Sequence, residues 1–104
     1  MMKVQIVKID KELPTPVYAK YGDAGMDLYT REAAVIAPGE QKMVGTGIKV
    51  AIPYGFEIQV RPRRGLAYKY GVSIVNTPGT VDHGYRGEIS IILTYLTYNA
   101  LKKI

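Results

Sequence analysis

Apolar and polar residues alternate with a period of two along much of the chain. In residues 56–61 three apolar and three polar side chains take turns: Phe56, Glu57, Ile58, Gln59, Val60 and Arg61. Strict alternation of this kind is typical of a β-strand with one buried face. Similar patterns predict further strands within residues 4–9, 41–52 and 87–98.

Eleven glycines and six prolines interrupt these strands, and no long helical stripe of apolar residues occurs between them. Gly45 and Gly47 predict a bulge or bend inside the 41–52 run. Residues Leu66–Tyr70 are expected to form one helical turn at most. The pattern favours a single all-β domain over residues 1–104, built as a sandwich or a barrel-like fold.

Residues Val75–Ile89 predict a β-hairpin with an unusually long tip. Strand-prone residues flank a tip that contains a Pro78-Gly79 pair and two candidate functional side chains, Asp82 and Tyr85. A simple hairpin needs only two turn residues. The additional polar and Gly-rich length indicates a backbone shaped around a ligand. Gly79 and Gly84 are expected at positive φ, the alternative being that either is an ordinary turn glycine.

Composition excludes several classes of function. The chain has no cysteine, and its one histidine, His83, cannot alone provide a zinc site or a Ser-His-Asp triad. No apolar run reaches membrane-spanning length and residues 1–3 do not begin a signal peptide, so we expect a soluble, cytoplasmic protein. The net charge of +5 and the Arg61-Pro62-Arg63-Arg64 cluster favour binding to anions.

Three loop motifs occur in a fixed order: Ala24–Leu28, Arg61–Ala67 and the hairpin Val75–Ile89. The third contains the pattern Gly-x-x-Asp-x-x-Tyr-Arg-Gly-Glu at residues 79–88. Together the motifs resemble the trimeric dUTPase (dUTP diphosphatase) family, and the resemblance covers about Lys3 to Leu96. It implies an all-β, dUTPase-like distorted jelly-roll or β-clip barrel.

The resemblance also implies a reaction, in which dUTP is cut between its α- and β-phosphates to give dUMP and pyrophosphate. Mg²⁺ would be held by nucleotide phosphates and water, with no direct protein ligand. The family builds each site from three subunits, which implies a homotrimer. Asp82 matches the acid that orients and deprotonates the attacking water; the alternative is that Asp82 merely caps its own turn.

Substrate selection is implied for the rest of the hairpin. Tyr85 matches the aromatic ring that packs on the deoxyribose and leaves no room for a 2′-hydroxyl, although a strand tyrosine can also simply cover an apolar edge. Uracil would be read by the side chain of one residue and the backbone of three others: Asn76, Gly79, Thr80 and Val81.

Arg63, Arg64 and Gly65 match the family's Arg-Ser-Gly phosphate-binding triplet, with Arg64 in place of the serine. Arg64 offers more charge on a longer side chain, so it could bind triphosphate yet misplace the scissile bond, or it could fill the pocket outright. The alternative is that these arginines form a solvated strand end. Asp27 matches the first motif's aspartate, which supports the phosphate and metal region, and is otherwise a loop cap.

Residues around these motifs are expected to act structurally. Arg86 and Glu88 would hold the hairpin and subunit contacts together, and His83 would point to solvent. The sequence ends at Ile104, where the family would next place a Gly-Asp-x-x-x-Gln segment and an Arg-containing tail. We therefore expect a C-terminally truncated product, a split form that another chain completes, or a natural short form with altered strand pairing. The loss of the last motifs would leave an exposed apolar edge at residues 95–98.

Three functions compete at this point. The first is a dUTPase. The second is a dUTPase-like protein that binds a nucleotide or a protein partner without turnover, which Arg64 and the short C-terminus favour. The third is a nucleic-acid-binding β-barrel, which the net charge, the arginine cluster and nine tyrosines favour; it ranks below the other two because the tyrosines lie at strand spacing.

Overall fold

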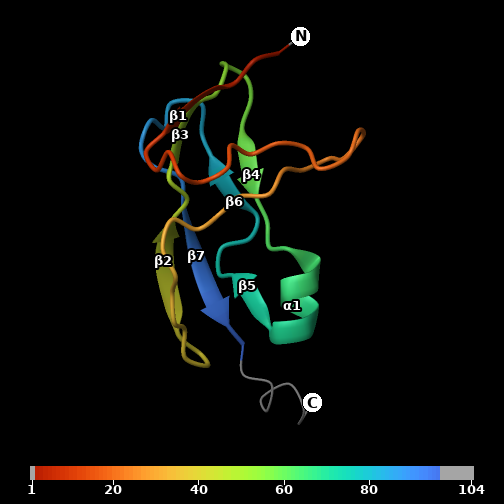
Figure 1. The fold of residues 1–104 in the computed structure, drawn as a ribbon, viewed down its shortest axis with the longest axis vertical. Helices are drawn as coiled ribbons and strands as arrows, with labels where there is room; N and C mark the ends of the chain where they lie inside the picture. The colour runs from red at the N-terminus through yellow and green to blue at the C-terminus, as the bar shows by residue number, and fades with distance from the viewer. Residues whose placement is uncertain (1, 97–104) are drawn as a thin grey trace.

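The computed structural model describes residues 2–96, which form seven short strands and one helix that lies at one side of the strands (Figure 1). The elements follow the chain as β1 (Gln5–Lys8), β2 (Gln41–Gly45), β3 (Ile48–Ala51), β4 (Ile58–Val60), α1 (Arg64–Tyr70), β5 (Val72–Ile74), β6 (Gly79–Val81) and β7 (Ser90–Tyr95). The prediction of a mainly β protein is confirmed. The predicted continuation of the last strand to residue 98 lies outside the described residues.

The strands form three small antiparallel sheets, with strand orders β1-β3, β2-β7-β5 and β4-β6. β5 and β7 pair with Ile74 opposite Leu93, so the predicted hairpin with a long tip is confirmed. Inside this tip lies a strand that the sequence did not predict, β6. It leaves the hairpin and pairs with β4, placing Val60 opposite Gly79 and Ile58 opposite Val81.

The predicted bend in residues 41–52 separates β2 from β3 at Thr46 and Gly47. Gly47 has a φ of +75°, a conformation that other L-residues rarely adopt. Its carbonyl oxygen accepts backbone N–H groups from Ile9 at 2.7 Å and Asp10 at 3.2 Å. The chain thereby turns from the β2-β7-β5 sheet into the pairing of β3 with β1.

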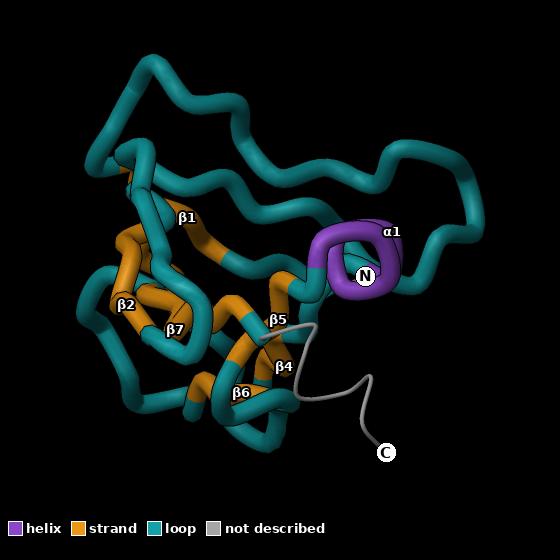
Figure 2. The backbone as a smooth tube through the Cα atoms, turned by 90° about the horizontal axis from the view of Figure 1, so that it is seen from below, coloured by secondary structure: helices purple, strands orange, loops and turns teal. Residues whose placement is uncertain are grey.

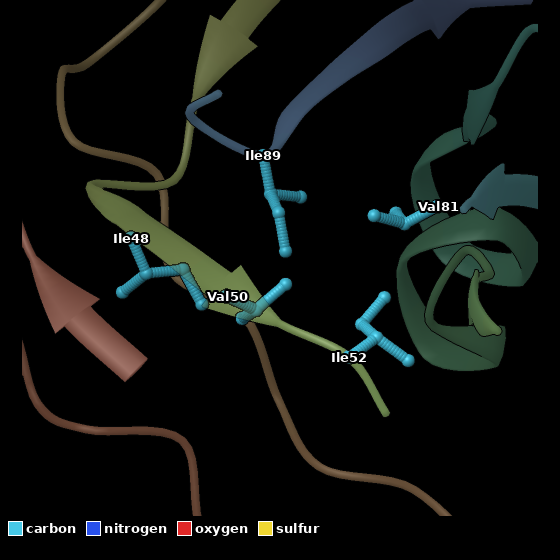
Figure 3. Packing of buried hydrophobic residues seen from close by; sticks show 5 residues of the cluster. All are labelled: Ile48, Val50, Ile52, Val81 and Ile89. Carbon is cyan, nitrogen blue, oxygen red and sulfur yellow. The ribbon is translucent and has the colours of Figure 1, made fainter. Parts of the chain in front are cut away.

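A buried cluster joins β3 of one sheet to β6 of another. It consists of five aliphatic side chains, shown in Figure 3: Ile48, Val50, Ile52, Val81 and Ile89. Val81 and Ile89 bracket the part of the hairpin tip from Asp82 to Glu88. Because β-branched residues are stiff and pack well on a pleated surface, this cluster fixes the backbone at both ends of that segment.

The helix is longer than predicted. α1 begins at Arg64 and runs to Tyr70, whereas the sequence led us to expect at most one turn over Leu66–Tyr70. Gly71 explains how the helix ends: at a φ of 69° its N–H bonds the carbonyls of Ala67 and Leu66, which leaves the last turn well capped. Within residues 2–96 no helix is long and apolar enough to cross a membrane.

Two glycine predictions are wrong. Gly79 and Gly84 do not have positive φ; the glycines that do are Gly22, Gly39, Gly47, Gly55 and Gly71. Gly79 is the first residue of β6, where an extended backbone is required for pairing with β4. Its lack of a side chain serves another purpose, because a Cβ there would lie 3.3 Å from the Asn76 amide nitrogen.

The predicted exposed edge at Tyr95 and Leu96 is also wrong within the described residues. β7 is the middle strand of its sheet, and β2 and β5 flank it. The Tyr95 carbonyl accepts the Gly39 N–H at 2.8 Å, and the Leu96 N–H donates to Gly71 at 2.9 Å. The backbone of β7 is therefore paired on both sides up to Leu96, although the Leu96 side chain stays half exposed.

Candidate functional site

Asp82 directly follows β6 in the hairpin tip, and its carboxylate has no hydrogen-bond partner within residues 2–96. Its neighbour Val81 is buried in the core, whereas Asp82 itself is exposed. The turn is closed by the backbone, through a 3.0 Å bond from the Tyr85 N–H to the Asp82 carbonyl. No hydrogen bond to the Asp82 carboxylate is found among residues 2–96, so this side chain does not cap its turn. It is available to bind water or a ligand.

Tyr85 lies along the tip backbone in a defined orientation. Its hydroxyl donates to the Glu88 carbonyl at 2.7 Å. A Cβ on Gly87 would lie only 2.7 Å from that hydroxyl oxygen and 2.9 Å from ring atom Cζ, so the absence of a side chain at Gly87 makes room for the ring. Nearly half of the Tyr85 side chain remains exposed. One part of the ring is thus packed on the hairpin and the other part can contact a ligand.

Asn76 and β6 form the other arm of the tip. The Thr77 N–H bonds the Ile74 carbonyl at 3.2 Å and turns the chain toward β6, and the Asn76 amide lies against Gly79. Among the described residues β6 has a neighbouring strand, β4, on one side only. The other edge of β6 therefore presents backbone N–H and C=O groups that a planar polar ligand could match.

The first and second motifs meet at the start of α1. A long connection between β1 and β2, residues 9–40, arches across to the side of the helix (Figure 2). There Asp27 Oδ1 lies 3.6 Å from Arg63 Nε, in an exposed ion pair. The loop before it is capped by Asp23, whose carboxylate accepts the Lys20 N–H at 2.9 Å. Asp27 therefore neutralises part of the arginine cluster and does not serve as the cap of that loop.

The structure does not bring the arginine triplet to Asp82 within one chain. In the β4–β6 pair Val60 lies opposite Gly79, so Arg63 extends beyond that end. Asp82 follows Val81, at the opposite end of the pair. Figure 1 shows the same arrangement, with α1 at one end of β4 and the chain after β6 running toward β1 and β3. Residues Arg63, Arg64 and Gly65 thus form one group, and Asp82 with Tyr85 another.

The supporting residues differ partly from prediction. Arg86 holds the hairpin as expected, by donating to the His83 carbonyl and to the Tyr85 carbonyl at 3.2 Å. Glu88 instead holds the bend between β2 and β3, where it accepts the Gly47 N–H at 2.9 Å and pairs with Arg31 at 3.3 Å.

His83 is exposed, but its ring does not simply point to solvent. It packs edge-on against the Tyr54 ring, at a centroid distance of 5.1 Å and an interplanar angle of 80°. Sequence reasoning missed both Tyr54 and Arg31 as partners of the tip. Nothing in the local pattern marks Arg31, whereas the Pro53-Tyr54-Gly55 sequence does signal a turn that presents an aromatic side chain.

The described residues contain no cluster of three or more His, Cys, Asp or Glu side chains that could hold a metal ion. A divalent cation at this site would need most of its oxygen ligands from a bound molecule or from water. Such a donor set is what Mg²⁺ accepts when it arrives with a phosphate chain.

A family model described as dUTPase matches residues 11–102. The chain is 48% identical over 92 residues to the deoxyuridine 5′-triphosphate nucleotidohydrolase of Nautilia profundicola, covering 88% of this chain and 65% of that protein. It is 55% identical over 93 residues to the enzyme of the same name from Corynebacterium glutamicum, covering 89% and 62%.

A solved structure shows the same fold. A mutant dUTPase from phage phi11 of S. aureus, described with a structural Mg(II) ion, superposes with a TM-score of 0.83 at 26% identity, covering 90% of this chain and 60% of that one. The chain thus spans slightly less than two thirds of the length of these relatives.

Proposed function

This chain belongs to the dUTPase family, and from that premise we propose that it hydrolyses dUTP to dUMP and pyrophosphate in the cytoplasm. The observation that carries the proposal is the hairpin tip. There the Asp82 carboxylate, which no group of residues 2–96 hydrogen-bonds, and the half-exposed ring of Tyr85 lie within one turn. The same turn is fixed by the core on both sides through Val81 and Ile89.

Asp82 would act as the general base. It takes a proton from a water molecule, and the resulting hydroxide attacks at phosphorus so that the bond between the α- and β-phosphates is cut and pyrophosphate leaves. An exposed carboxylate that bonds no other side chain or backbone group within residues 2–96 is suited to this task, because it can hold the water by a charge-assisted hydrogen bond. Phosphoryl transfer then depends mainly on positioning and charge neutralisation.

Uracil and deoxyribose would be selected by the two arms of the tip. The edge of β6, Gly79–Val81, that no strand of the described part of the chain covers can, together with Asn76, match the acceptor–donor–acceptor edge of uracil. Tyr85 would pack on the sugar and exclude a 2′-hydroxyl. Both devices reject a wrong nucleotide by leaving polar groups unpaired or by collision, which discriminates more strongly than a small difference in apolar contact.

The triphosphate would be bound by Arg63, Arg64 and Gly65, with Asp27 orienting Arg63 through their ion pair. Mg²⁺ bound to the phosphate oxygens would neutralise charge that develops on the leaving pyrophosphate.

We further propose a homotrimer with shared sites. This part of the proposal is supported by the register of β4 and β6, which leaves the arginine triplet and Asp82 at opposite ends of the pair. A single chain would therefore hold the base and sugar at one place and offer phosphate ligands at another. Assembly of identical chains would bring one chain's hairpin to another chain's triplet.

Pyrophosphate release from dUTP in the presence of Mg²⁺, with dTTP, dCTP and UTP measured in parallel, tests the proposed function. We expect release from dUTP with strong preference over the other three nucleotides. Binding of dUTP without release would favour the protein that only binds nucleotide. If the purified chain neither releases pyrophosphate nor binds dUTP, the proposal is overturned.

Arg64→Ser is expected to raise kcat for dUTP by about threefold to tenfold, because a short hydroxyl would replace a long guanidinium beside the phosphate chain and small misplacements of reacting groups are costly. Steady-state kinetics would show the gain. Arg61→Ser is the matched control, since Arg61 is exposed and bonds Gln59 at 2.6 Å outside the triplet. An unchanged or lower kcat in Arg64→Ser would show that Arg64 does not hinder the reaction.

A further inference from the structure

The hydroxyl of Tyr85 is bound to a backbone group whose residue is itself clamped. The acceptor is the Glu88 carbonyl oxygen, at 2.7 Å, and the ring lies close against Gly87 between the two residues. The direction of the Tyr85 ring therefore depends on the position of the Glu88 peptide group. Any movement of that carbonyl would carry the hydroxyl, and the exposed part of the ring, with it.

The Glu88 carboxylate is held from two sides by residues distant in the sequence. One oxygen accepts the Gly47 N–H at 2.9 Å, and the other lies 3.3 Å from Arg31 Nη2. Only 20% of the Glu88 side chain is exposed, so solvent screens these contacts less than it screens an ordinary surface pair. A Cβ on Gly45 would collide with the same carboxylate, so Gly45 provides the space it occupies.

The bend that receives this carboxylate is a rigid point of the fold. Gly47 sits at positive φ with two N–H groups on its carbonyl, and Thr46 binds the Ile89 carbonyl through both its N–H at 3.0 Å and its hydroxyl at 2.6 Å. These bonds fix the strand at Ile89, and the Ile89 N–H, which belongs to the same peptide group as the Glu88 carbonyl, donates to the Ile48 carbonyl at 2.9 Å. The carboxylate contacts of Glu88 hold the other side of that peptide group, at the Glu88 Cα.

From this geometry we propose that Glu88, clamped by Arg31 and Gly47, is a positioning residue that orients Tyr85 and thereby sets the selectivity for deoxyribose over ribose. The inference rests on the proposed function of the hairpin. Glu88 itself does not contact the nucleotide. Its effect passes through the Tyr85 hydroxyl, which distinguishes it from a residue that only stabilises the fold.

Substitutions at Glu88 test this with the ratio of kcat/KM for dUTP to that for UTP, measured on the full chain. Glu88→Gln keeps an acceptor for the Gly47 N–H but loses the ion pair, and the ratio is expected to fall about threefold. Glu88→Ala loses both contacts, and a fall of about tenfold or more is expected. KM for dUTP should change less than the ratio. Glu40→Gln, which removes an exposed pair with Lys42, is the matched control.

Arg31→Gln loosens the clamp without altering Glu88 and keeps the test available if Glu88→Ala does not fold. Tyr85→Phe removes the hydroxyl, so Glu88→Gln should add little to the loss of selectivity in that background. Full additivity of the two effects, or an unchanged ratio in folded Glu88→Ala and Arg31→Gln, would overturn the inference.

Binding of dUMP and UMP to the unaltered chain, measured by calorimetry, separates the two proposals. If the unaltered chain binds dUMP in preference to UMP and the folded variants show the same preference, only the role of Glu88 is overturned. If the unaltered chain neither hydrolyses dUTP nor prefers dUMP, the proposed function falls and this inference falls with it.

Discussion

Asp82→Asn is expected to lower pyrophosphate release from dUTP by about 10²–10⁴-fold, the range that a positioned general base contributes. The amide has the shape of the carboxylate but cannot accept a proton from water at neutral pH. Because no described residue hydrogen-bonds the Asp82 carboxylate, the substitution breaks no contact of the fold within residues 2–96. Binding of dUTP should therefore persist, and removal of a negative charge near the phosphates can tighten it.

Rates for this variant are best measured under single-turnover conditions, so that product release does not mask the chemical step. Asp10→Asn is a suitable control, since Asp10 Oδ1 accepts the Glu12 N–H at 3.0 Å and the amide oxygen of Asn can do the same. A rate within a few fold of the unaltered chain would exclude Asp82 as the base. A loss of dUTP binding together with the rate would assign it to binding.

Tyr85→Ala is expected to reduce discrimination against UTP by about a hundredfold while weakening dUTP binding by about tenfold or less. Removal of the ring opens space for a 2′-hydroxyl, so the transition state for UTP is no longer penalised by a collision that dUTP never had, and kcat/KM for UTP rises relative to that for dUTP. The apolar contact with the sugar is lost for both nucleotides and accounts for the common weakening. The measurement is kcat/KM for each nucleotide over the same range of Mg²⁺ concentration.

Tyr68→Ala provides the matched control, because Tyr68 is 89% exposed on α1 and outside the hairpin. It should leave both nucleotides unaffected. An equal loss of kcat/KM for dUTP and UTP in Tyr85→Ala would remove the sugar-selecting role and leave Tyr85 as a purely structural part of the tip.

The fold could be predicted from sequence where the information is local. Alternation of side chains locates β1, β4 and β7, and glycine locates the bend at Gly47, because each depends on neighbouring residues alone. β6 could not be found in this way. Gly79-Thr80-Val81 follows a Pro-Gly turn signal, and it becomes a strand only because β4, about twenty residues earlier, supplies its partner.

The candidate site shows the same division. Asp82 and Tyr85 are close in sequence, so a single motif predicts that they share a turn. The contacts between Arg31 and Glu88, Tyr54 and His83, and Asp27 and Arg63 each join distant segments. Their geometry depends on the register of strands and the path of long connections, which no local pattern contains. The first of these contacts is the one that carries the proposal for Glu88.

The register of β4 and β6 has a further consequence for the behaviour of the protein in solution. If one chain carries the hairpin and another completes its site, the activity per chain falls on dilution as the assembly dissociates. A chain with a defective hairpin would still provide its arginines to the site of a neighbouring chain. Two variants, one defective in the hairpin and the other in the arginines, would then regain activity when mixed. The rate of turnover per chain would then depend on the protein concentration, because a single chain does not contain a complete site.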